Sequence, residues 1–115
     1  MIKIYSDIEK CTVKVTGHAT NGKDRNPLVC AGVSSLVSGL AQNVMFAQDI
    51  GQLKSTPVIR LDEGKAKILC KPKKAQQAAI IHLFMIFDLC FRQMQAQFPD
   101  LIEFNGDEFL SSPPF

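Results

Sequence analysis

A histidine and a cysteine stand on either side of a short polar segment near the N-terminus. His18 follows a stretch of alternating apolar residues, and Cys30 stands where a helical pattern begins. An imidazole can take the proton of a thiol, and the thiolate so formed attacks carbonyl carbons. These residue types therefore suggest a base and a nucleophile, provided that the fold brings His18 and Cys30 together.

The surroundings of Cys30 favour this chemistry. Asn26 is predicted to be the N-cap of a helix and Pro27 its first residue, where the missing N–H of proline costs nothing. Cys30 then lies in the first helical turn, and a helix N-terminus favours the negative charge of a thiolate. We also expect the free N–H groups of this turn to donate to an oxyanion formed on a substrate carbonyl.

The direction of the His18 side chain depends on where its strand ends. Strand alternation places His18 on the face opposite Val13 and Val15. A bulge at Gly17 would turn the imidazole toward the helix, and so would an end of the strand before His18. Closing the loop to Cys30 costs only about 2 kcal/mol beyond a constant, so contact is allowed but not required. The alternative is a surface histidine and a cysteine that packs as a small core residue.

Hydrophobic periodicity predicts the elements that must position these residues. Alternation with period two predicts strands, and apolar spacings of three and four predict helices. Gly51 and Pro99 are expected to end the two helices, and Gly64 to allow a tight turn between two strands. The order ββαββα predicts an α+β fold, with an antiparallel four- to five-stranded sheet and two helices packed on one face. The predicted strands lie at 2–4, 13–15, 57–61, 65–71 and, at an edge, 101–104, and the helices run from 28 to near 51 and from 75 to 98.

Length and composition fit one globular domain. The 115 residues divide into a domain at 1–105 and a tail at 106–115 that lacks periodicity and is expected to fray. Hydrophobic residues make up 46% of the chain and charged residues 21%, as in ordinary folded proteins. The net charge is only +2, and no basic run is interleaved with aromatic residues. We therefore expect no direct binding of nucleic acid.

Neither end of the chain nor its longest apolar stretch predicts a membrane location. The N-terminus alternates apolar and polar residues, whereas a signal peptide has a continuous apolar segment, so we expect a cytoplasmic protein. The stretch 78–91 is interrupted by His82 and Asp88 and is too short to cross a bilayer. It is predicted to be a core helix, and no membrane partner is expected.

The four cysteines predict neither a disulfide framework nor a metal site. Cys11, Cys30, Cys70 and Cys90 form no C-x-x-C pair, and no resolving cysteine stands close to Cys30 in the sequence, as a thiol redox sensor would need. Zinc would have to recruit Cys11 with His18, which strand alternation places on opposite faces. We expect no metal and no cofactor.

The second helix is apolar on more than one side. Phe84, Phe87, Phe91 and Met94 cover more of its circumference than one sheet face requires. A homodimer interface would bury the excess, and so would packing against both the sheet and the first helix. His82 and Asp88 are not at a contacting helical spacing, so His82 is interpreted as a core or interface histidine and not as a second base.

Two short motifs resemble those of a known family. The segments Gly-His-Ala at 17–19 and Val-Cys-Ala-Gly-Val-Ser at 29–34 resemble the signature of the ribosomal-processing cysteine protease family, Prp (YsxB-like). The order of elements and an aromatic-proline pair at Phe98-Pro99 are similar as well. The resemblance implies a cysteine endopeptidase that removes the N-terminal extension of the large-subunit ribosomal protein number twenty-seven, after an aromatic residue in a short apolar motif. It also implies that His18 is the base, Cys30 the nucleophile and Ser34 a supporting or substrate-binding residue.

The chain departs from the family pattern just before the cysteine. Relatives carry Gly-x-Asp there, and this chain has Arg25-Asn26-Pro27. The group that orients His18 is therefore open, with Asp24 as one candidate, and the alternative function is an inactive ribosome-associated binding module of the same fold. We further hypothesise that substrate orders the loop at 19–26, and that an apolar groove between this loop and the helices receives the peptide.

Overall fold

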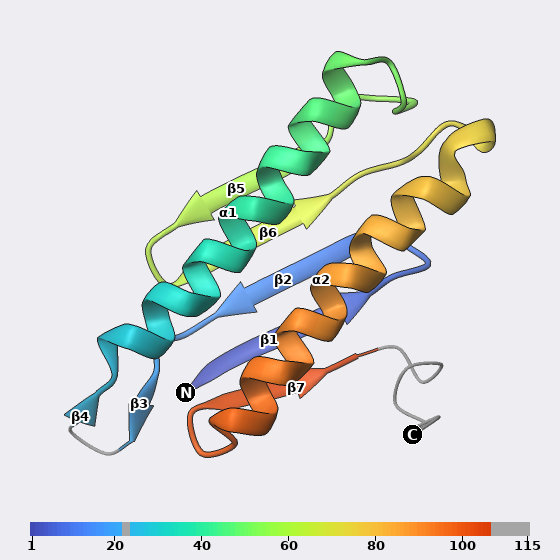
Figure 1. The fold of residues 1–115 in the computed structure, drawn as a ribbon. Helices are drawn as coiled ribbons and strands as arrows, with labels where there is room; N and C mark the ends of the chain where they lie inside the picture. The colour runs from blue at the N-terminus through green and yellow to red at the C-terminus, as the bar shows by residue number, and fades with distance from the viewer. Residues whose placement is uncertain (22–23, 107–115) are drawn as a thin grey trace.

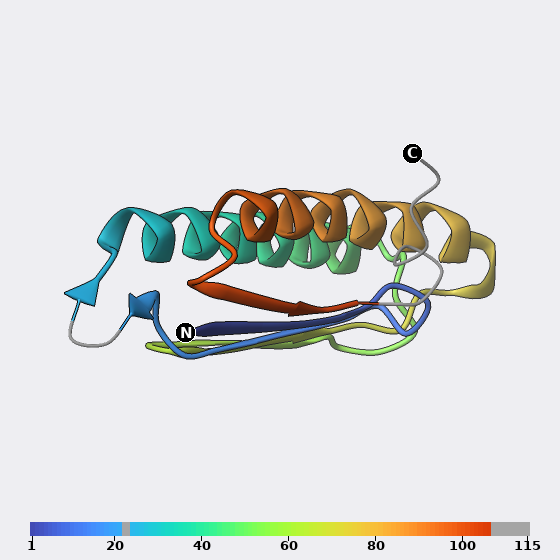
Figure 2. The ribbon, with the colours of Figure 1, turned by 90° about the horizontal axis from the view of Figure 1, so that it is seen from below.

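The computed structural model describes residues 1–21 and 24–106, which form two layers (Figures 1 and 2). A five-stranded sheet makes one layer, and two long helices lie side by side on one of its faces. This confirms the predicted α+β class and the ββαββα order. The elements are β1 (Ile2–Asp7), β2 (Thr12–Thr16), β3 (Thr20–Asn21), β4 (Asp24–Arg25), α1 (Pro27–Asp49), β5 (Val58–Asp62), β6 (Lys65–Leu69), the 3₁₀ turn η1 (Lys74–Gln76), α2 (Gln77–Gln97) and β7 (Ile102–Asn105).

The sheet has the order β5-β6-β2-β1-β7. Its first four strands pair antiparallel, as predicted, but β7 pairs parallel to β1 at the edge. The reason is the path of the chain, because α2 carries it back to the end of the sheet at which β1 begins. There the N–H of Ile2 donates to the carbonyl of Leu101 at 2.8 Å, and the two strands continue in the same direction. Residues 107–115, most of the predicted frayed tail, lie outside the described residues.

Helix α1 begins as its sequence predicts. The side-chain oxygen of Asn26 accepts the N–H groups of Leu28 and Val29 at 3.1 and 3.2 Å, and Pro27 occupies the first turn. The helix ends at Asp49, and Gly51 follows with a φ of +76°. One side of α1 is buried against the sheet, in the row Val29, Val33, Val37, Leu40, Ala41, Val44 and Ala47.

Helix α2 is covered on two sides. Phe84 and Phe91 are fully buried, while Phe87 and Met94 are partly buried. The last two face small positions of α1: a β-carbon added at Gly39 would lie 3.3 Å from the Phe87 ring, and one at Gly32 would lie 2.9 Å from the Met94 methyl. Packing against both the sheet and α1 therefore accounts for these four apolar residues.

Two polar side chains of α2, Asp88 and His82, lie in opposite surroundings: one is buried and the other is exposed. Asp88 is fully buried, and its carboxylate accepts the Ser6 hydroxyl and the Arg92 Nε, each at 2.7 Å. These hydrogen bonds offset the free energy that it costs to bury the Asp88 carboxylate. His82 is exposed, so it is not a core histidine. Its outward position follows from helical phase, since it lies on the side of α2 away from Phe84 and the sheet.

Both helices agree closely with the predicted ranges, 28 to near 51 and 75–98. The segments Pro27–Asp49 and Lys74–Gln97 are long and apolar enough, by length and composition, to cross a membrane. The membrane prediction considered only the stretch 78–91, which is shorter than either of these segments. Each helix packs one side against the sheet (Figure 2), as core helices of a domain do.

Candidate active site

His18 reaches the helix side of the sheet because its strand ends early. Strand β2 stops at Thr16, and Gly17 follows with a φ of +91°, a conformation that glycine adopts without strain. A β-carbon at Gly17 would lie 2.2 Å from the Met1 carbonyl oxygen, so a side chain has no room there. Of the two alternatives, the strand therefore ends before His18, and Gly17 is a turn and not a bulge.

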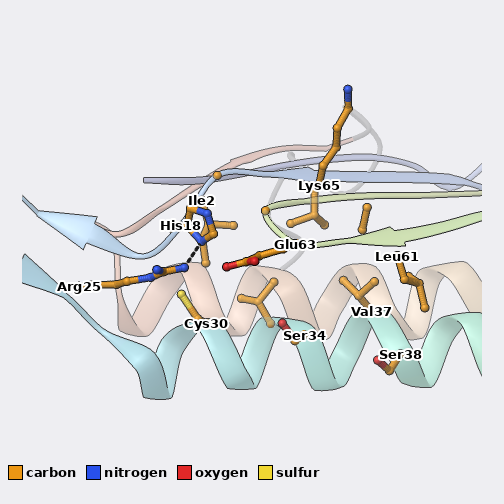
Figure 3. A pocket seen from close by; sticks show the side chains of 15 residues that line it. Ile2, His18, Arg25, Cys30, Ser34, Val37, Ser38, Leu61, Glu63 and Lys65 are labelled. Carbon is orange, nitrogen blue, oxygen red and sulfur yellow. Dashed lines mark hydrogen bonds between the residues drawn. The ribbon is translucent and has the colours of Figure 1, made fainter.

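Backbone hydrogen bonds hold the residue after His18 against the sulfur of Cys30. The N–H of Ala19 donates to Cys30 Sγ at 3.3 Å, and the Ala19 carbonyl accepts the N–H of Asn26 at 2.7 Å. Strands β3 and β4 pair through Thr20 and Arg25 and close the intervening loop at its base. Imidazole and thiol consequently lie at the same end of one cleft (Figure 3), as the hypothesis of a base and a nucleophile requires.

Arg25 is the hydrogen-bond partner of the imidazole in this structure. Its guanidinium Nη2 donates to His18 Nδ1 (Figure 3). Because a guanidinium cannot accept, Nδ1 must carry the lone pair and Nε2 the proton. Sequence reasoning treated Arg25 only as a departure from the family pattern and missed this contact. The pairing of β3 with β4, which includes Arg25, spans only two residues on each strand, too few to leave a periodic signal in the sequence. The side chain of Asp24, the candidate orienting group, lies outside the described residues.

The first turn of α1 does not supply the predicted oxyanion donors. Pro27 has no N–H, and those of Leu28 and Val29 already donate to the Asn26 side chain. The N–H of Cys30 donates to the Asn26 carbonyl at 3.2 Å. The prediction was wrong because it counted the turn's donors without subtracting the cap that satisfies them.

The turn between β5 and β6 covers the other side of the imidazole. Gly64 has a φ of +70°, its carbonyl accepts the N–H of Gly17 at 2.9 Å, and a β-carbon there would lie 2.8 Å from His18 Nε2. The neighbouring Glu63 extends its carboxylate into the cleft (Figure 3). Sequence reasoning identified this turn but had no means of placing it beside His18, since nearly fifty residues separate them.

The cleft has a volume of about 220 Å³ and lies between α1 and the β5–β6 hairpin. The prediction placed an apolar groove between the loop and the helices; the tertiary structure forms it instead along the hairpin, because α1 lies over that edge of the sheet (Figure 1). Ser34 lies in it one turn after Cys30, and Ser38 one turn further. Its lining residues are Ile2, Val15, Gly17, His18, Arg25, Cys30, Val33, Ser34, Val37, Ser38, Leu61, Glu63, Gly64, Lys65 and Ala66.

A second pair of thiols lies at the other end of β2. Cys11 and Cys70 are buried, and the N–H of Cys70 donates to the Cys11 carbonyl at 3.1 Å. The hydrogen bond from the Cys70 thiol lowers the pKa of Cys11, against the opposing effects of burial and Asp7. The same bond, together with burial, raises the pKa of Cys70. Within residues 1–21 and 24–106, no group of three or more His, Cys, Asp or Glu side chains is arranged to hold a metal ion.

Comparison with known proteins decides the family. A family model described as "Cysteine protease Prp" matches residues 1–103. The chain belongs to the Prp family of cysteine proteases. This confirms the family predicted from the motifs around His18 and Cys30. No curated protein sequence matches the chain.

Solved structures, two of them of a Prp protease, share this fold. The ribosomal processing protease Prp from S. aureus, in complex with a substrate peptide, aligns with a TM-score of 0.67 at 18% identity, covering 93% of this chain and 100% of that one. The same protease with a covalently linked product peptide gives 0.65 at 18% identity and the same coverage. The protein SMU.848 from Streptococcus mutans gives 0.60 at 18% identity, covering 91% of this chain and 90% of that one.

Proposed function

We propose that this chain removes the N-terminal extension of the large-subunit ribosomal protein number twenty-seven, with Cys30 as nucleophile and His18 as base. The observation that carries the proposal is the hydrogen bond from the Ala19 N–H to Cys30 Sγ, because it joins the backbone beside His18 to the sulfur at one end of an apolar cleft. Membership of the Prp family supports the reaction class. The S. aureus Prp, described as a ribosomal processing protease, supports the choice of substrate.

The reaction follows from these two side chains. His18 takes the Cys30 proton, and the sulfur attacks the carbonyl carbon of the scissile peptide bond. When the C–N bond breaks, the imidazolium returns the proton to the leaving amine and a thioester remains on Cys30. Water, deprotonated by His18, then hydrolyses the thioester and restores the thiol. Arg25 would donate to the oxyanion, because a guanidinium has five N–H donors and the N–H groups of the first turn are already bonded.

The cleft suits a short apolar peptide. Val33, Val37 and Leu61 offer apolar side chains along it, and Ser34 offers a hydroxyl near the sulfur as a supporting group. The hairpin that forms one wall includes β5, an edge strand whose outer side is unpaired in the sheet. An extended substrate would add to such an edge through main-chain hydrogen bonds. These features support an apolar cleavage motif in the substrate.

We also propose a homodimer through the outer surface of the helices. Met45 and Phe46 of α1 and Ile86 and Leu89 of α2 are each exposed by 44% or more. Exposed His82 precedes Ile86 by one turn on the same side of α2. Sedimentation velocity tests the proposal: Ile86→Lys should convert a dimer into a monomer, and a wild-type monomer would contradict it.

An inactive binding module of the same fold is a second candidate. Arg25 favours it, because its guanidinium occupies the Nδ1 lone pair of His18 that a base would use. Under the protease proposal, the incoming peptide draws Arg25 away. The hypothesis that substrate orders the loop at 19–26 falls in part on residues 22 and 23, which lie outside the described residues, and it stays a prediction.

The deciding experiment incubates the protein with the full-length precursor of the ribosomal protein and follows the mass of the product. We expect loss of the N-terminal extension, and no cleavage of a control precursor whose aromatic residue at the cleavage site is changed to aspartate. Binding of the precursor without cleavage, by both the wild type and Arg25→Ala, would favour the inactive module.

A further inference from the structure

The face of the sheet opposite the helices is open (Figure 2), and we propose that it binds single-stranded RNA. This replaces the expectation of no direct nucleic acid binding, which considered only net charge and runs along the chain, whereas strand register gathers cations that are far apart in the sequence. Strand register arranges its outward side chains in rows across the sheet. One row consists, in order, of Asn105, Tyr5, Lys14, Lys67 and Arg60. Three cations thus stand on adjacent strands. Since neighbouring strands lie about 4.8 Å apart, these cations span roughly 10 Å of the surface.

Acidic residues balance the neighbouring row but not this one. In the next row, Glu103 is the register partner of Lys3, and Asp62 is the register partner of Lys65. Neither acid belongs to the row of Lys14, Lys67 and Arg60. The row on the other side of Lys14, Lys67 and Arg60 consists of Asp7, Thr12, Leu69 and Val58. Asp7 is the one acidic residue in it. Positive charge is therefore concentrated along the middle of the face.

The three cations have no acidic partner in the part of the chain that the structure describes. Lys14 Nζ instead lies 5.6 Å from the centre of the Tyr5 ring, which is 44% exposed. Like charges directly opposite one another on adjacent strands destabilise a sheet. The Tyr5 ring offsets part of this cost at Lys14, and a bound polyanion would offset more of it.

The geometry favours a nucleic acid strand among polyanions. Single strands bind where cations follow the phosphate backbone and an aromatic ring stacks on a base, and Tyr5 adjoins Lys14 in the same row. An anionic membrane would instead require several apolar side chains to insert beside the cations. Beside the row, only Val58, at 38% exposure, and the partly buried Leu69 are apolar. The choice of RNA over DNA rests on the proposed ribosomal substrate, whereas the charge and register do not depend on it.

Fluorescence anisotropy with a labelled RNA of about twelve mixed nucleotides tests the proposal. The variant K14Q/R60Q/K67Q should bind at least about tenfold more weakly than wild type, and the slope of log affinity against log salt should fall by about 2, since each phosphate contact contributes about 0.7. The matched control is K54Q/K71Q/K74Q, which removes the same charge from exposed lysines elsewhere. The control should retain affinity within about twofold.

Other measurements separate the remaining outcomes. The row variant should unfold at the same or a higher temperature than wild type, because it relieves repulsion. The proposal is overturned if the two triple variants lose RNA affinity equally, or if the wild type binds no RNA. It is also overturned if the wild type binds single-stranded DNA or vesicles of anionic lipid more tightly than RNA. Cleavage of the ribosomal precursor is measured on K14Q/K67Q, which leaves the β5 edge intact, and should be unchanged. If the chain is not a protease, the wild type will not cleave the precursor but will still bind RNA.

Discussion

Strand β2 has a cysteine site at each of its ends, and the two differ in exposure and in whether an imidazole lies beside the thiol. At one end, Cys11 and Cys70 are buried and hydrogen-bonded to each other. At the other end, Cys30 is partly exposed, accepts a backbone N–H and opens into a cleft beside His18. One strand thus holds two thiol sites at opposite ends of the sheet.

A hydrogen-bonded thiol is not by itself a candidate nucleophile, because the proposed role also requires access and a neighbouring base. Hydrogen bonding from Cys70 lowers the pKa of Cys11, yet only 1% of Cys11 is exposed and no imidazole adjoins it. Cys30 combines access, a neighbouring base and a space for substrate. The role proposed for Cys30 therefore depends on its surroundings, and the buried pair serves as an internal control for it.

The largest difference in cleavage rate is expected between Cys30→Ala and Cys11→Ala, which each remove the sulfur at one of the two sites. Cys30→Ala is expected to lower precursor cleavage by at least about 10⁴-fold, because no covalent intermediate can form. Cys11→Ala should retain the wild-type rate within about twofold under conditions in which the protein stays folded. Mass spectrometry of the product measures both, and cleavage that survives in Cys30→Ala would refute the assignment of the nucleophile.

Removal of the base should have the next largest effect. We expect His18→Ala to lower kcat/KM by about 10²- to 10⁴-fold, the range of general acid–base contributions. His82→Ala, which changes an exposed histidine of α2, is the matched control and should change the rate by less than about twofold. Equal rates for the two variants would show that His18 is not the base.

Gly64→Ala tests whether the hairpin turn positions the imidazole. The added β-carbon would lie 2.8 Å from His18 Nε2, and a displacement of about 1 Å at the reacting groups can cost about 10²-fold in rate. Gly51→Ala imposes a similar backbone strain at a φ of +76°, but its nearest neighbour is Lys73 Nζ at 3.9 Å. Both variants should lose about 1–2 kcal/mol of stability. Only Gly64→Ala should lose activity, and equal activities would show that the turn has no positioning role.

Alkylation compares the thiols directly in the wild-type protein. Near neutral pH, iodoacetamide should modify Cys30 at least about tenfold faster than Cys11 or Cys70, since access and a neighbouring imidazole favour reaction. Peptide mapping by mass spectrometry gives the rate at each position. Faster modification of the buried pair would reverse the comparison.

The smallest effect is expected in the stability of the buried pair. Cys70→Ala removes the donor to Cys11 and should lower the free energy of unfolding by about 1 kcal/mol, while precursor cleavage stays unchanged. Denaturant unfolding and the cleavage assay, run in parallel, separate the two effects. A large loss of activity at wild-type stability would show that the two ends of β2 are coupled.

Local sequence determined the elements of the fold. Asn26 and Pro27 specify the start of α1, and Gly51 follows its end, because caps act within one turn of the helix. Apolar periodicity predicted both helices and the ββαββα order of elements along the chain, but not the order of strands in the sheet. The predicted site residues His18, Cys30 and Ser34 also line one cleft. The roles of these residues stay predictions.

Contacts between segments far apart in the sequence were decided only by the tertiary structure. The Gly64 turn lies beside His18, Cys11 pairs with Cys70, and three cations from separate strands form one row, yet none of these arrangements leaves a periodic signal in the chain. The parallel pairing of β7 belongs to the same class, whereas the engaged donors of the first turn follow from the local cap at Asn26. Periodicity reports which face of an element is buried, whereas register and crossover between elements decide which residues meet.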